Sequence, residues 1–235
     1  MLFRSVKPDL KVSKVFKENK ENKVFKVKPD LKVSKASKVN KAFKENKALL
    51  AAKNIFLLIL LTGRGAQQYQ HLIVEFELAL QLGHDLPHTD QPWTASRIQP
   101  MVECAYPCLE LADDRHANYN HLKTNFFTLV AENAWNHGAI LGHRIEPWQF
   151  EKLWQTLGVA RVNGEKIGHG KSQDVMGHPL NALAWLANEC QRRGRPVLAG
   201  QWVTTGSWVA SFFPVTGQTL RFDFDNLAGV DVHIV

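Results

Sequence analysis

Three glutamates are the residues of this chain whose type and spacing best fit chemistry. Glu75 and Glu77 lie two residues apart in the run VEFELAL, and Glu110 follows in PCLELADDR. Residues two apart in a strand point to the same face, so Glu75 and Glu77 would hold their carboxylates side by side. A hard divalent cation such as Mg²⁺ or Mn²⁺ prefers oxygen ligands and would offset the repulsion between them. The pattern predicts a metal site with positions open for a bidentate substrate and water. The alternative is an ordinary strand with two solvated glutamates.

The expected secondary structure places these glutamates on strands. Strands are expected at Leu72–Leu82, Ala105–Leu111, Ala139–Leu141, Val159–Val162, Gln201–Thr205, Thr219–Phe224 and Gly229–Ile234, and helices at Trp93–Met101, Asn120–Val130, Pro147–Leu157 and Pro179–Arg193. Because strands and helices do not alternate strictly, the expected fold class is α+β, with a mixed sheet that closes on itself and flanking helices.

The helix expected at Pro179–Arg193 has the clearest pattern. Pro179 suits the first turn of a helix, and Gly194 with Pro196 ends it. One apolar face is formed by Leu180, Leu183, Ala184, Ala187 and Cys190. This face is expected to pack on the core.

The first 53 residues differ from the rest in charge and in repetition. Residues 1–53 hold 16 basic and five acidic residues, a net charge of +11, whereas residues 54–235 hold 13 basic and 17 acidic residues, a net charge of −4. The segment VKPDLKVSK begins at Val6 and again at Val27, and its lysines leave no apolar stripe for a packed helix. Residues 1–53 are therefore expected to be a disordered or loosely helical extension. It could bind nucleic acid or acidic surfaces as a polycationic arm, or have no selected role.

Residues 54–66 form a short apolar connector. Their uninterrupted apolar stretch, Ile55–Leu61, is too short to cross a bilayer as a helix. A secretory signal is the alternative, although the basic stretch before it is longer than that of a typical signal. Three cysteines without a CxxC pair fit reduced thiols, so a cytoplasmic location is expected. Residues 67–235 have the composition of one globular domain with a sizeable core.

Five segments of this domain resemble those of a known family. They are VEFELALQLGHDLP, PCLELADDR, VAENAWNHGAILG, VMGHPLNALAWLANECQRRGRPVLAG and VTTGSW. From about Leu72 to the C-terminus, their order and spacing resemble the 2-keto-4-pentenoate hydratase and 4-oxalocrotonate decarboxylase family of the fumarylacetoacetase superfamily.

The resemblance implies a fold, a cofactor and a reaction. It implies a β-roll, Mg²⁺ or Mn²⁺ bound by Glu75, Glu77 and Glu110, a small 2-oxo acid as substrate, and assembly as a homo-oligomer. A cation held there would stabilise the enolate of a chelated 2-oxo acid. The implied activity is that of a lyase, the hydration of 2-hydroxypenta-2,4-dienoate to 4-hydroxy-2-oxopentanoate in aromatic-compound catabolism. Decarboxylation of a 2-oxo diacid of the 4-oxalocrotonate type is the alternative.

The matched motifs imply roles for five further residues. Glu132 and Asn133 would orient water or the metal ligands, unless they only cap turns or lie in solvent. His178 could serve as an acid or base at the pocket, or be structural. Thr205 and Gly206 match a turn whose hydroxyl and backbone N–H can hold a substrate carboxylate. The alternative for this pair is a tight turn that merely needs glycine.

The chain departs from the family before Glu75. Family members carry an upstream lysine in a GxKxGLT-like stretch, and no such stretch is recognisable in residues 1–66. A catalytically weakened homologue, which binds metal without a complete pocket, is therefore a further alternative. Another is a tethering protein whose basic arm does the binding.

Overall fold

The structure, a computed structural model, describes residues 2–3, 66–121 and 126–235. The expectations for residues 1–53 and 54–66 fall outside this part of the chain, apart from residues 2–3 and 66. No helix among the described residues is long and apolar enough to cross a membrane.

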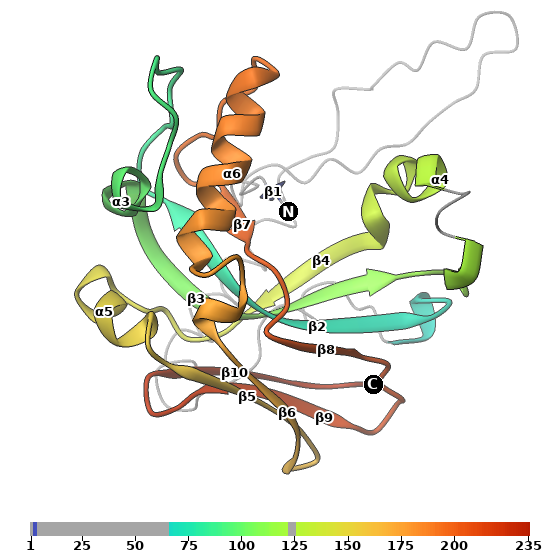
Figure 1. The fold of residues 1–235 in the computed structure, drawn as a ribbon. Helices are drawn as coiled ribbons and strands as arrows, with labels where there is room; N and C mark the ends of the chain where they lie inside the picture. The colour runs from blue at the N-terminus through green and yellow to red at the C-terminus, as the bar shows by residue number, and fades with distance from the viewer. Residues whose placement is uncertain (1, 4–65, 122–125) are drawn as a thin grey trace, which may run out of the picture. The chain divides into compact units, whose positions relative to one another are not determined.

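Two β-sheets form the body of the fold (Figure 1). The larger sheet has the order β1 (Leu2–Phe3), β7 (Trp202–Thr204), β2 (Leu72–Leu82), β3 (Val102–Asp113) and β4 (Asn136–Leu141), and β8 (Val209–Phe212) also pairs with β2. The smaller sheet has the order β10 (Ala228–His233), β9 (Thr219–Phe224), β5 (Leu157–Val162) and β6 (Glu165–Lys171). Strand β2 therefore lies inside the larger sheet, with β3 along one edge and β7 and β8 along the other.

The strand directions differ from the mixed sheet that was expected. Every strand pair among the described residues is antiparallel. Short turns explain part of this, because β5 and β6 are joined by Asn163 and Gly164, which both have positive φ as a two-residue hairpin requires. The α+β class itself is confirmed.

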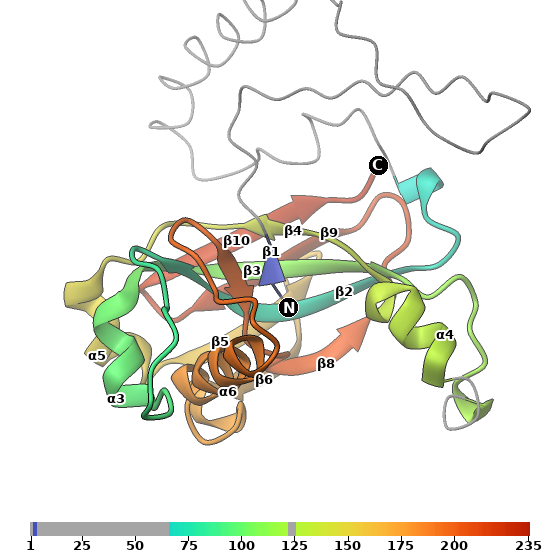
Figure 2. The same ribbon diagram turned by 90° about the horizontal axis from the view of Figure 1, so that it is seen from above.

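Short helices surround the sheets. They are η1 (Ala66–Gln68), α3 (Ala95–Ile98), η2 (Gln99–Met101), η3 (Tyr119–His121), α4 (Phe126–Ala131), η4 (Asn133–Trp135), η5 (Pro147–Gln149), α5 (Phe150–Leu153), η6 (Ser172–Asp174) and the longer α6 (Pro179–Arg192), where η marks a 3₁₀ helix. Helices α3, α5 and α6 gather at one end of the sheets, and α4 lies at the other (Figure 2). The Asn188 side chain on α6 bonds the backbone N–H and C=O of Trp93, which ties α6 to the segment before α3.

Most of the expected elements are confirmed, and the differences are local. Strands β2 and β9 have the expected bounds, and α6 ends one residue early. The helices expected at Trp93–Met101 and Pro147–Leu157 each consist of a short α-helix joined to a 3₁₀ turn, and Leu157 already belongs to β5. Strands β1, β6 and β8 were not expected.

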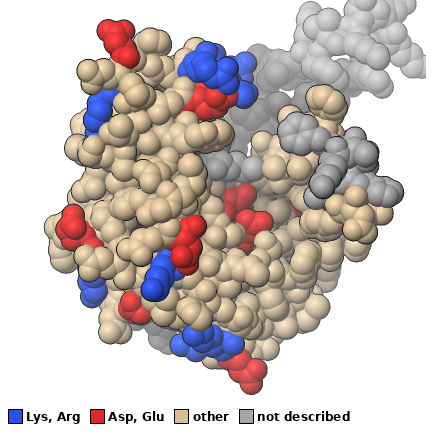
Figure 3. Space-filling view, in the orientation of Figure 1, with Lys and Arg blue, Asp and Glu red and all other residues tan. Residues whose placement is uncertain are grey.

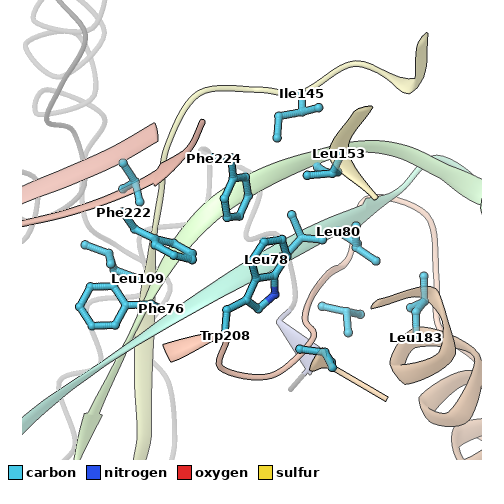
Figure 4. Packing of buried hydrophobic residues seen from close by; sticks show 14 of the residues in the cluster. Phe76, Leu78, Leu80, Leu109, Ile145, Leu153, Leu183, Trp208, Phe222 and Phe224 are labelled. Atoms are coloured by element: carbon cyan, nitrogen blue, oxygen red, sulfur yellow. The ribbon is translucent and has the colours of Figure 1, made fainter. Parts of the chain in front are cut away.

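The core lies between the two sheets and explains how β2 is oriented (Figure 4). Phe76, Leu78 and Leu80 are fully buried on one face of β2. The ring of Phe76 lies 5.6 Å from that of Phe222 on β9, in an edge-to-face arrangement. Because side chains alternate along a strand, the odd-numbered residues of β2 point to the opposite face, where Glu75 and Glu77 lie.

Candidate functional site

The three predicted glutamates lie on one face of the β2/β3 pair. Glu75 stands directly opposite Glu110 in the antiparallel register, and Glu77 stands opposite Cys108. The Cβ atoms of directly opposed residues lie about 4.5–5.5 Å apart, and diagonal neighbours lie roughly 7–8 Å apart. The exposed fractions of Glu77 and Glu110 are 3% and 8%. The alternative of two solvated glutamates is therefore wrong for Glu77.

Hydrogen-bond donors from β7 and the following turn fix the two buried carboxylates. The backbone N–H of Gly206 donates to Oε2 of Glu77 at 2.9 Å. The Thr204 hydroxyl donates to Oε2 of Glu110 at 2.8 Å, and the Asn136 amide on β4 donates to Oε1 at 2.7 Å. Both oxygens of Glu110 thus have partners from two different strands, which fixes the orientation of this carboxylate.

Glu75 is held at the more open end of the same face. Its two oxygens accept hydrogen bonds from Ser207 at 2.9 Å and Ser211 at 3.2 Å. These donors, like those of the buried pair, are neutral. No ion pair to Glu75, Glu77 or Glu110 occurs among the residues that the structure describes.

Burial and mutual repulsion perturb the titration of this group. Burial and the charge of Glu110 raise the pKa of Glu77 to about 8, against the opposing hydrogen bond from Gly206. Burial and the charges of Glu77 and Glu110 also raise the pKa of the Cys108 thiol. The carboxylates therefore act on one another, and their negative charge is not neutralised by a described cationic side chain.

The donor set fits a hard divalent cation in chemistry and in backbone position. Glu75, Glu77 and Glu110 supply carboxylate oxygens from adjacent strands, and the raised pKa of Glu77 is the response expected where a compensating positive charge is missing. In the side-chain conformations of the structure, each carboxylate is turned to its own donor. No group of three or more His, Cys, Asp or Glu side chains in the described ranges is arranged to hold a metal ion. Convergence on one cation requires rotation of these side chains.

A pocket of about 350 Å³ opens above the buried pair. Its lining consists of Glu77, Glu110, Met176, Ala182, Trp185, Leu186, Val203, Thr204, Thr205 and Gly206. Figure 3 shows acidic groups in a hollow on the face of the protein turned toward the viewer. The pocket thus has a polar floor of strand residues and an apolar side supplied by α6 and the loop before it.

Thr205 and Gly206 lie beside the glutamates, as the sequence predicts. The Thr205 hydroxyl donates to the backbone oxygen of Leu78 at 3.1 Å, and the N–H of Gly206 donates to Glu77. Gly206 has φ of 120°, a conformation that favours glycine. In this structure the pair supports Glu77 and the turn itself. A role in holding substrate stays a prediction.

Glu132 and Asn133 lie elsewhere, at the end of α4. Glu132 accepts hydrogen bonds from Arg115 at 3.0 Å and from the indole N–H of Trp135 at 3.1 Å. It lines a separate pocket of about 220 Å³. Nearby, the pKa of Tyr119 is raised by burial, by its hydrogen bond to Asp114 and, less, by the charge of Glu75. This cluster therefore adjoins the open end of the site but does not line the pocket of the buried pair.

His178 caps helix α6. Its Nδ1 accepts a hydrogen bond from the backbone N–H of Leu180 at 3.1 Å, and its ring lies 4.7 Å from that of Trp154. Burial lowers the pKa of His178, so the imidazole is neutral near pH 7. His178 does not line the pocket of Glu77 and Glu110.

The sequence analysis missed the apolar side of the pocket and several orienting donors. Ala182, Trp185 and Leu186 recur at positions i, i+3 and i+4 of α6, which is the spacing of one helix face. That second stripe could have been recognised. No local pattern marks Asn136 or Thr204, because their contact with Glu110 depends on how distant strands pair.

Comparisons with known proteins identify relatives of this chain. The chain is 32% identical over 157 residues to 2-keto-4-pentenoate hydratase 1 of Dechloromonas aromatica, covering 67% of this chain and 58% of that protein. It is 32% identical over 135 residues to 4-oxalocrotonate decarboxylase of Pseudomonas putida, covering 57% and 50%. The chain thus spans between half and three fifths of the length of these relatives. No family model matches it.

Solved structures give the same result for the fold. The 4-oxalocrotonate decarboxylase from Pseudomonas putida G7, complexed with magnesium and adipate, superposes with a TM-score of 0.64 at 25% identity, covering 72% of this chain and 62% of that one. A fumarylpyruvate hydrolase from Pseudomonas aeruginosa, in complex with Mn²⁺ and pyruvate, superposes with a TM-score of 0.53 at 16% identity, covering 72% and 68%, and supports the fold alone. The fumarylacetoacetase-type fold expected from the sequence is confirmed. The chain is therefore related to 2-keto-4-pentenoate hydratases and 4-oxalocrotonate decarboxylases, with which it shares about 32% identity, and it has the fumarylacetoacetase-type fold.

Proposed function

We propose that this chain carries the catalytic domain of a divalent-metal-dependent hydratase. The proposed reaction adds one water to 2-hydroxypenta-2,4-dienoate and gives 4-hydroxy-2-oxopentanoate, a step of aromatic-compound catabolism. The observation that carries the proposal is the set of three glutamates facing one another across β2 and β3, two of them buried and none paired with a described cation. A cytoplasmic location is part of the proposal, supported by three cysteines that form no disulfide.

The proposed ligands of Mg²⁺ or Mn²⁺ are Glu75, Glu77 and Glu110. When bound, such a cation supplies stabilisation for the negative charge that develops on a chelated 2-oxo acid. The N–H of Gly206 would keep one oxygen of Glu77 oriented and leave the other for coordination. Thr204 and Asn136 would orient Glu110, whose two oxygens each have a second lone pair for a cation.

The proton transfers of the reaction need an acid or base near the substrate. Among the described residues that line the pocket, Glu77 and Glu110 are the only ones with an acidic or basic side chain. We propose that Glu132, with Asn133 beside it, orients water at the open end of the site, where Tyr119 links the cluster to Glu75 electrostatically. His178 is proposed to act on the site only through α6, whose first turn it caps.

The test combines metal uptake with turnover. Isothermal titration of the full chain with Mn²⁺ should show one site, and the absorbance of the dienoate should fall only in the presence of metal. Glu77→Gln should lose both signals. Glu165→Gln, at an exposed position of β6, is the matched control and should keep both. Absence of Mn²⁺ uptake by the unaltered chain would refute the proposal.

Decarboxylation of a 2-oxo diacid is the second candidate, supported by the 32% identity to a 4-oxalocrotonate decarboxylase. Release of CO₂ from such a diacid, without loss of the dienoate, would select it. Metal uptake without either reaction would indicate a catalytically weakened homologue.

Assembly and the basic arm are separate parts of the proposal. A homo-oligomer is supported by large apolar side chains at the surface, such as Phe127, which is 84% exposed. Sedimentation analysis tests it. Binding of the arm to acidic polymers is tested by deleting residues 1–53, whose net charge is +11, and unchanged binding would exclude a role for the arm.

A further inference from the structure

Helix α6 has two apolar faces, one buried in the core and one that packs partly against it and also lines a pocket. Leu180, Leu183 and Ala187 are buried in the core. Ala182, Trp185 and Leu186 lie on another face and line the pocket above Glu77 and Glu110, together with Met176 from the preceding loop. These four residues are called the apolar rim. Trp185 and Met176 are 60% and 57% exposed, so their side chains have apolar surface available for a ligand.

Met176 is held at the rim by the backbone around it. Its φ is 49°, in the left-handed region that a non-glycine residue rarely adopts, and Gly177 follows with φ of 76°. The Asn181 side chain on α6 donates to the backbone oxygen of Met176 at 2.9 Å. The backbone conformation and this hydrogen bond therefore fix the position of Met176 beside α6.

The charged side chains among the described lining of the pocket are all acidic. Its floor carries Glu77 and Glu110, its remaining described lining is neutral, and no Lys, Arg or His occurs among the described lining residues. A ligand carboxylate at the rim would lose hydration and meet no described cationic side chain there. An uncharged alkyl or alkenyl tail would instead bury apolar surface against Trp185 and Met176.

We propose that Trp185 and Met176 are specificity-determining residues that select 2-oxo acids with an uncharged apolar tail over 2-oxo diacids. This inference rests on the proposed function, because the metal-binding end of the ligand must lie at the glutamates for its tail to reach the rim. It gives the rim a role that the glutamates cannot supply, since they recognise only the end that all 2-oxo acids share.

The expected size of the effect follows from the area in contact. Full burial of one methylene strengthens binding about fourfold. Because Trp185 and Met176 leave a bound tail partly exposed, three methylenes should together strengthen binding roughly tenfold, which is less than three full burials would give. For the Mn²⁺-loaded chain we therefore expect 2-oxohexanoate to bind about tenfold more tightly than pyruvate. We expect 2-oxoadipate, which has the same carbon chain with a terminal carboxylate, to bind more weakly than 2-oxohexanoate.

The test is calorimetric titration of oxalate, pyruvate, 2-oxohexanoate and 2-oxoadipate into the Mn²⁺-loaded full chain and its variants. Trp185→Ala should reduce the preference for 2-oxohexanoate over pyruvate to less than about threefold and leave oxalate affinity unchanged. Trp185→Phe should retain most of the preference. Trp148→Ala removes a similarly exposed tryptophan that does not line this pocket and should change nothing. The exposure of Trp185 makes these variants compatible with folding, which circular dichroism checks.

Each outcome bears on one of the two claims. If oxalate binds but 2-oxoadipate binds as tightly as 2-oxohexanoate or more tightly, the inference is overturned and the proposed function is left intact. A preference for 2-oxohexanoate that survives in Trp185→Ala and in a Trp185→Ala/Met176→Ala double variant also overturns it. Failure of oxalate to bind overturns the proposed function, and the inference with it.

Discussion

Replacement of Glu77 by glutamine is expected to make the metal-free protein less sensitive to pH. Glu77 is 3% exposed, and its pKa is about 8 in the folded protein against 4.5 for an unperturbed glutamate. Between these values the unfolded chain releases a proton that the folded chain retains. The raised pKa therefore lowers the free energy of unfolding as the pH rises from about 4.5 to about 8, and the loss levels off above that. The amide oxygen introduced by Glu77→Gln could still accept the Gly206 N–H without titrating.

The magnitude follows from one pKa unit corresponding to about 1.4 kcal/mol. From pH 5 to pH 8 the wild-type chain should lose about 3 kcal/mol of unfolding free energy through Glu77, and the variant should not. Urea unfolding in the presence of EDTA at both pH values measures this difference, because titrating groups away from Glu77 contribute equally to the two proteins. The same pH dependence in both would show that Glu77 is not buried beside unneutralised charge. Saturating Mn²⁺ should restore the lost unfolding free energy in the wild-type chain but not in the variant.

Three further substitutions, one of them with a matched control, test the supporting structure. Gly170→Ala would drive a Cβ into the backbone oxygen of Trp208 and should cost several kcal/mol of stability or abolish folding. Gly138→Ala is the control, because a Cβ there would have nothing within 4 Å, and it should be nearly neutral. Thermal unfolding measures both. Asn136→Ala removes the 2.7 Å hydrogen bond to Glu110 and should weaken Mn²⁺ affinity about tenfold, and unchanged affinity in titration calorimetry would contradict the assigned role. His178→Ala removes a helix cap and should cost about 1 kcal/mol with little effect on Mn²⁺ binding, so that a large loss of affinity would show that the histidine acts directly at the site.

The sequence predicts β2 and β9 well because their signals are local. Alternation within Leu72–Leu82 is enough to assign both the strand and its two faces, whatever it pairs with. The partnership of Glu75 with Glu110 is different, since it depends on the register between β2 and β3. The shared motif order suggested that Glu110 belongs to the site, but only the paired strands show it opposite Glu75.

Strand β6 shows why a local reading can fail. Gly168 and Gly170 argue against a strand, and the sequence analysis expects none at this segment. In the structure both glycines are required by another part of the chain, because an added Cβ would collide with Val209 or with the backbone of Trp208. The Asn163-Gly164 turn was a hairpin signal in the sequence, and with it β6 was predictable.

Strand β2 couples the stability of the fold to the chemistry of the site. Its even-numbered side chains, including Phe76 and Leu78, are fully buried between the sheets, and burial of one such side chain contributes about 1.5–3 kcal/mol. Its odd-numbered side chains place Glu75 and Glu77 where like charges accumulate, which opposes folding in the absence of a cation. Burial of the apolar face thus offsets the electrostatic repulsion on the other face. The glutamates are therefore held on a rigid central strand rather than on a loop. A core substitution such as Leu78→Ala should therefore weaken Mn²⁺ affinity as well as stability, although Leu78 points away from the site.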